Sequence, residues 1–102
     1  MPCSFRFFFD PGSGTCLWSA NADARAQYGY AVDHHALPIG APMKAALDGL
    51  IARYDTWLDW NNPGSGGLWS DEDRNAFNFA ARECLHRLRK ELPDCTIADE
   101  AD

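Results

Sequence analysis

The stretch SFRFFFDPGSGTCLWSA, residues 4–20, predicts a β-hairpin near the start of the chain. Phe5, Phe7 and Phe9 stand at every second position, which is the period of a strand with one buried face. The segment DPGSG that follows is typical of a turn, because proline presets φ and glycine supplies φ > 0. The second strand then covers residues 15–20.

A loop over residues 11–14 sets the register that we expect for this hairpin. The predicted cross-strand pairs are Phe9 with Cys16, Phe7 with Trp18 and Phe5 with Ala20. This register gathers the large apolar side chains, Trp18 included, on one side of the hairpin, where helices would cover them.

Three helices are predicted after the hairpin. Asn21 is a suitable N-cap for a short helix over residues 22–28 that ends at Gly29. A second helix starts near Pro42, ends at residues 61–63, and has an apolar arc made of Met43, Leu47, Leu50, Ile51, Tyr54, Trp57 and Leu58. After the turn PGSGG (63–67), a third helix runs from Ser70 to about residue 92, and the order Ser70-Asp71-Glu72-Asp73 resembles a capping box.

These elements predict an α+β fold in a single domain, residues 1–102. An N-terminal antiparallel hairpin packs on two long antiparallel helices plus one short helix. A brief strand at residues 95–97 is expected to join the hairpin edge, and the acidic tail, residues 94–102, is expected to fray in part.

The overall charge narrows the class of partner. The chain of 102 residues carries a net charge of −6, which argues against direct binding to nucleic acid or to an anionic membrane. Its start, MPCSFRFFFD, has too short an apolar run for a signal peptide, and no stretch reaches the roughly 20 apolar residues of a membrane span. We therefore expect a cytoplasmic protein. Its negative charge permits a basic protein as partner, and the alternative is that the acidic residues only maintain solubility.

The sequence contains no recognisable catalytic or cofactor motif. The cysteines lie far apart without a C-x-x-C pair, so free thiols are expected at Cys3, Cys16, Cys84 and Cys95. His34 and His35 lack both an orienting third group and the i, i+4 spacing of helical metal ligands. We expect no catalytic residue, cofactor or metal. The alternative, an enzyme using His34 or His35, requires these side chains to converge with a carboxylate or a thiol in a pocket.

The second helix carries an acidic stripe that the fold alone does not explain. Asp48, Asp55 and Asp59 fall within one narrow arc, and Asp55 and Asp59 are like charges at i, i+4. Either Arg82 or Arg89 of the third helix neutralises the stripe across the bundle, or the stripe meets a basic partner.

Trp60 lies outside the apolar arc of the second helix, and Phe79 lies outside that of the third. Exposed aromatic residues beside charge have the composition of interaction hot spots. The alternative is that the loop of residues 61–69, or the first helix, folds over these two side chains, with Trp69 stacked on Trp60. The residues expected to bind a partner are therefore Asp48, Asp55, Asp59 and Trp60.

Three segments look like a pattern shared by other small bacterial proteins, and this pattern identifies no activity. They are CLWSANADAR (16–25), YGYAV (28–32) and YDTWLDW (54–60), the last followed by a Pro/Gly loop and W-S. In kind, as one small acidic domain with no catalytic motif and with an acidic–aromatic surface, the chain resembles the cognate immunity proteins of bacterial toxin–immunity loci, including contact-dependent growth inhibition systems. The resemblance implies a stoichiometric inhibitor whose acidic face meets a basic nuclease toxin. A small cytosolic regulatory or adaptor domain is the alternative.

Overall fold

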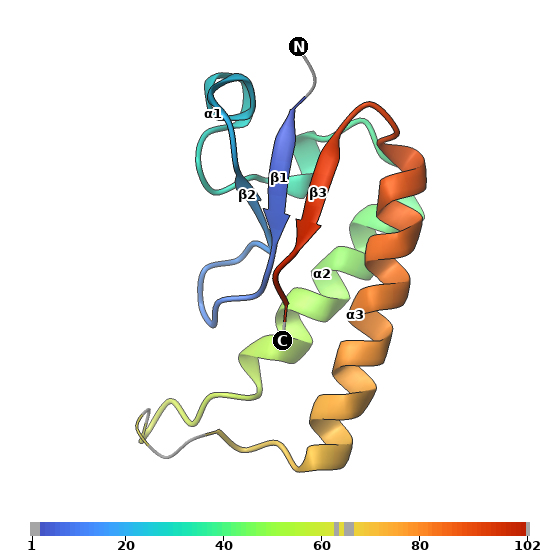
Figure 1. The fold of residues 1–102 in the computed structure, drawn as a ribbon. Helices are drawn as coiled ribbons and strands as arrows, with labels where there is room; N and C mark the ends of the chain where they lie inside the picture. The colour runs from blue at the N-terminus through green and yellow to red at the C-terminus, as the bar shows by residue number, and fades with distance from the viewer. Residues whose placement is uncertain (1–2, 63, 65–66, 102) are drawn as a thin grey trace.

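The computed structural model describes residues 3–62, 64 and 67–101. It shows a three-stranded sheet in the order β2-β1-β3 with two long helices across one of its faces (Figure 1). In chain order the elements are β1 (Ser4–Phe7), β2 (Leu17–Ser19), α1 (Ala22–Tyr28), the 3₁₀ helix η1 (His34–Ala36), α2 (Ala41–Asp55), α3 (Asp71–Glu91) and β3 (Thr96–Asp99). The predicted α+β class is confirmed.

The hairpin register differs by one residue from the prediction. The observed pairs are Phe5 with Ser19, Arg6 with Trp18 and Phe7 with Leu17. Trp18 turns to the sheet face opposite the one that carries Phe7, where its ring stacks on Phe8 at a centroid distance of 4.8 Å. Its indole Nε1 also donates to the Phe8 carbonyl at 3.1 Å. Placing Trp18 on the helix-facing side was wrong, because Leu17 takes that place.

The third strand comes from the C-terminal segment, as predicted, and runs parallel to β1. Its register extends from Ser4 opposite Thr96 to Phe7 opposite Asp99. Beyond β3, the Glu100 N–H donates to the carbonyl of Phe7 at 2.9 Å. β1 therefore has a hydrogen-bonded neighbour on each side and is the central strand.

Capping residues define where two of the helices begin. The Asn21 side chain accepts a hydrogen bond from the Ala24 N–H, and α1 ends at Gly29, which has φ +78°. At the start of α3, Ser70 and Asp73 form the reciprocal bonds of a capping box. Both predicted N-caps are confirmed.

α2 begins where the sequence predicts but ends at Asp55, several residues before the expected end at Asn61. The Thr56 hydroxyl donates to the carbonyl three residues back, which satisfies an acceptor of the last turn. The placement of Asp55 and Asp59 as a helical i, i+4 pair was therefore wrong, because Asp59 and Trp60 lie beyond the helix. Of the predicted PGSGG turn, residues 63, 65 and 66 lie outside the described residues.

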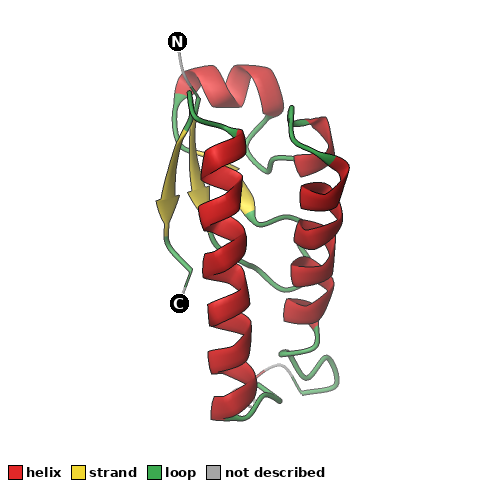
Figure 2. Cartoon of the chain, turned by 90° about the vertical axis from the view of Figure 1, so that its right-hand side faces the viewer, coloured by secondary structure: helices red, strands yellow, loops and turns green. Residues whose placement is uncertain are grey.

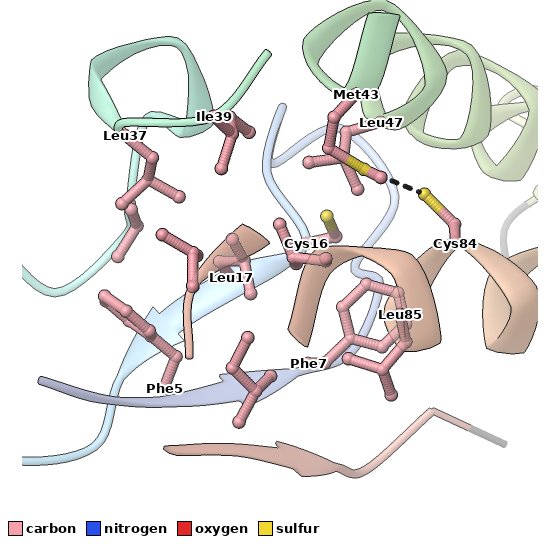
Figure 3. Packing of buried hydrophobic residues seen from close by; sticks show 14 of the residues in the cluster. Phe5, Phe7, Cys16, Leu17, Leu37, Ile39, Met43, Leu47, Cys84 and Leu85 are labelled. Carbon is pink, nitrogen blue, oxygen red and sulfur yellow. Dashed lines mark hydrogen bonds between the residues drawn. The ribbon is translucent and has the colours of Figure 1, made fainter. Parts of the chain in front are cut away.

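The core lies between the sheet and the antiparallel pair of α2 and α3, which stand side by side (Figure 2). Phe5, Phe7 and Leu17 come from the sheet, and Met43 of α2 meets Cys84 of α3, whose Sγ is 3.6 Å from the Met43 sulfur (Figure 3). The four cysteines are free thiols, as predicted. Burial raises the pKa of Cys16 to about 12, so this thiol packs as a small apolar side chain.

Candidate functional site

The end of α2 is built against the turn of the hairpin. Asp55 Oδ1 accepts a hydrogen bond from the Gly12 N–H at 2.9 Å, and the carbonyl of Asp55 accepts one from Trp60 Nε1 at 3.1 Å. Gly12 has φ +80°, and a Cβ at this position would lie 3.1 Å from Trp60 Cη2. The backbone conformation therefore favours glycine at this position, and a larger residue would also make a tight contact with the tryptophan ring.

Asp59 shapes the chain that leaves α2. Its Oδ1 accepts hydrogen bonds from the N–H groups of Asn61 and Asn62 at 3.0 and 3.2 Å, which is how aspartate stabilises a turn. This turn presents Trp60 with 58% of its surface exposed. The alternative in which Trp69 covers Trp60 is excluded, because Trp69 packs on Tyr54 and Phe77. We call Asp55, Asp59 and Trp60 the Trp60 surface.

The third acidic residue, Asp48, belongs to a separate cluster. Its Oδ1 accepts from Nε2 of His34 at 2.6 Å and from Nε2 of His35 at 2.8 Å. The hydrogen bonds from His35 and then His34 lower the pKa of the Asp48 carboxyl. Asp33 caps η1 by accepting the His35 N–H, and this 3₁₀ turn aims both imidazoles at α2. The sequence did not predict that His34, His35 and Asp48 meet.

Arginines of α3 do not neutralise the acidic residues of α2 in the way that the alternative required. Arg82 lies 3.5 Å from the Asp99 carboxylate, and Arg89 donates twice to the Ile97 carbonyl. Both guanidinium groups therefore hold β3 against α3. The partners of Asp48 are histidines, and those of Asp55 and Asp59 are backbone N–H groups.

A hollow of about 260 Å³ lies among residues of β1 and the chain after it, of α2 and α3, and of the chain after β3. The residues that line it are Arg6, Phe8, Phe9, Tyr54, Phe77, Glu100 and Ala101. The sequence contains no signal for this hollow, because Glu100 and Ala101, which follow β3, line one side of it. The enzyme alternative required His34 or His35 to meet a carboxylate or a thiol in a pocket. Asp48 supplies the carboxylate, but none of these three side chains lines this hollow.

An ion pair at the rim of this hollow predicts a pH effect on stability. The Arg6 guanidinium binds the Glu100 carboxylate at 2.7 and 2.9 Å and lowers its pKa below the ordinary value of 4.5. Because the pKa is lower in the folded state, the pair stabilises the fold above pH ~4.5 and stops doing so as pH falls through the lowered value. Glu100→Gln should therefore melt below wild type at pH 7 in thermal unfolding, and this difference in Tm should shrink as the pH is lowered toward 3. A difference that persists unchanged at pH 3 would contradict this assignment.

None of the helices in the described part of the chain has the length and apolar character that a bilayer crossing requires.

Comparison with known proteins places the chain in a family. A comparison with curated proteins found no match. A family model described as Serratia CdiI immunity protein-like matches residues 11–97, a range that contains the Trp60 surface, Asp48 and both histidines of its cluster. The match confirms the resemblance to immunity proteins of contact-dependent growth inhibition and supports a toxin-neutralising role. The chain belongs to the Serratia CdiI immunity protein-like family.

Proposed function

We propose that this protein is a cytoplasmic immunity protein that binds one cognate toxin domain through the Trp60 surface and blocks it without catalysis. The observation that carries the proposal is an exposed tryptophan held in place beside two carboxylates, in a member of an immunity-protein family. The partner is a toxin with a basic surface, and a nuclease is the class that we favour, because enzymes acting on nucleic acid carry basic footprints.

Trp60 has the properties of a binding anchor. It exposes 58% of its surface, yet its indole N–H is bonded to Asp55 and its ring lies against Gly12. A side chain that is already oriented loses less conformational entropy when a partner covers it. Tryptophan is also the residue type most enriched among interface residues that dominate affinity.

The two carboxylates of the Trp60 surface supply charge. Their partners are backbone N–H groups, which are dipoles and do not cancel the formal negative charge. Asp48 lies seven residues before Asp55, about two helical turns along the same face of α2, and adds to the same negative field. With a net charge of −6 on the whole chain, this field would speed the encounter with a basic toxin.

The experiment that tests the proposal is co-expression with the toxin candidate encoded by the neighbouring open reading frame. We expect the candidate alone to arrest growth, this protein to restore it, and the two chains to copurify. A candidate that is toxic but neither bound nor neutralised would contradict the immunity role for this pair. A partner that binds but is not toxic would favour the regulatory or adaptor function instead.

A further inference from the structure

The cluster of His34, His35 and Asp48 is a second site that toxin binding does not explain. We propose that these three side chains form a binding site for a transition-metal ion of the zinc type. Their ligand atoms lie within 4.8 Å of one another, and they come from η1 and α2, two elements that no sequence motif connects. No metal site was expected from the sequence, because nothing in it indicates that a carboxylate lies beside the two histidines.

The donor set selects the kind of metal. Two imidazole nitrogens and one carboxylate oxygen suit zinc and its neighbours, whereas magnesium and calcium prefer oxygen alone. Three protein ligands leave the fourth tetrahedral position open. His34 is 97% buried while the side chains of His35 and Asp48 are about half exposed, so this open position faces solvent.

The distances show what the ion would replace. The Nε2 atoms of His34 and His35 lie 2.6 and 2.8 Å from Asp48 Oδ1, which are hydrogen-bond lengths. With metal–ligand bonds of about 2.0–2.2 Å, tetrahedral ligand atoms lie about 3.3–3.5 Å apart, so the two distances from Nε2 to Oδ1 need to lengthen by roughly 0.5–0.9 Å. The ion takes the place of the two Nε2 protons. In each neutral ring the proton moves from Nε2 to Nδ1, and Nε2 becomes the ligand atom.

The surroundings of His34 limit the expected affinity. Its Nδ1 is buried and has no hydrogen-bond partner among the residues that the structure describes. When the ring is neutral and Nε2 donates its proton to Asp48, Nδ1 is an acceptor without a donor. Once Nε2 binds a metal, the proton sits on Nδ1 without an acceptor, and losing such an outer partner weakens metal sites about 10–100-fold. We therefore expect micromolar binding of zinc.

The test uses the full, tag-free chain, freed of metal by dialysis against a chelator, and titrated with Zn²⁺ in a calorimeter. We expect one ion per chain, a higher Tm with Zn²⁺, and a loss of affinity of more than about tenfold in His35→Gln and in Asp48→Asn. Both altered side chains are half exposed, so the variants should fold, which circular dichroism checks. His86→Gln is the matched control, because this third histidine is exposed on α3, and it should bind Zn²⁺ like wild type.

Cysteine thiolates are the competing ligands for the metal ion. The absorption spectrum of bound Co²⁺ distinguishes thiolate ligands from nitrogen and oxygen ligands. Cobalt bound by nitrogen and oxygen shows only visible bands, whereas a cobalt–thiolate bond adds a near-ultraviolet charge-transfer band. That thiolate band would overturn the proposal, as would an unchanged affinity in His35→Gln or the lack of any binding at millimolar Zn²⁺. The test needs no toxin, so its outcome is independent of the proposed immunity function.

Discussion

Phe7→Ala is expected to lower the free energy of unfolding by about 3–5 kcal/mol, the usual cost of removing a buried aromatic ring. Phe7 is fully buried on the central strand, opposite Leu17, and its ring meets the edge of Phe9 at a centroid distance of 5.3 Å. Small domains are stable by only about 5–15 kcal/mol, so the variant should lose a large part of its stability. Urea unfolding followed by circular dichroism measures this difference.

Phe79→Ala is the matched control for this substitution. Phe79 exposes 67% of its surface on α3, so the same truncation should change stability by less than about 0.5 kcal/mol. Equal losses in the two variants would show that β1 is not the centre of the core.

Trp60→Ala is expected to weaken binding of the cognate toxin by about 30-fold or more, with little change in unfolding free energy. Truncation of an interface hot spot costs at least about 2 kcal/mol, and 1.4 kcal/mol corresponds to a factor of ten in affinity. Surface plasmon resonance with a catalytically inactive toxin domain measures the change. Trp60→Phe should recover part of the affinity because it restores apolar area, and Phe79→Ala should bind like wild type.

A double variant separates the contribution that the charge of the Trp60 surface makes to toxin binding from the contribution of its aromatic contact. Asp55→Asn combined with Asp59→Asn removes two charges but keeps an oxygen that accepts the same backbone N–H groups. Association with the toxin should slow, and its dependence on salt should become shallower, while dissociation changes less. If Trp60→Ala and this double variant both bind with wild-type rates, the toxin binds elsewhere on the molecule.

Local features of the fold were predictable because their causes are local. The caps at Asn21 and Ser70 follow from side chains that satisfy nearby N–H groups. The hairpin register was not predictable from alternation, because both faces of the sheet carry large aromatic residues. Phe7 and Trp18 are both buried, yet on opposite faces, so apolar character alone cannot assign them.

The end of α2 shows a similar limit. Trp57 and Leu58 continue the apolar arc of the helix, so periodicity extends the prediction past the true end at Asp55. The helix stops because Thr56 bonds to the last turn and the following chain bends into the turn made by Asp59. Polar side-chain bonds of this kind leave no periodic signal.

The candidate sites were predictable only in part. Trp60 was expected on the surface because it falls outside the apolar arc, and it is exposed, but it lies beyond α2 in the turn made by Asp59, where a helical arc does not apply. The pairing of Asp48 with His34 and His35 depends on how residues 29–40 pack against α2, and this contact joins residues 13 and 14 positions apart through an irregular segment. Neither spacing nor composition encodes such a contact.

The most direct test of the immunity function is to titrate the purified protein into its cognate toxin domain while the activity of that toxin is measured. We predict that activity falls linearly and reaches zero at one protein per toxin, as expected for a tight stoichiometric inhibitor. Full toxin activity in the presence of excess folded protein would contradict the immunity function.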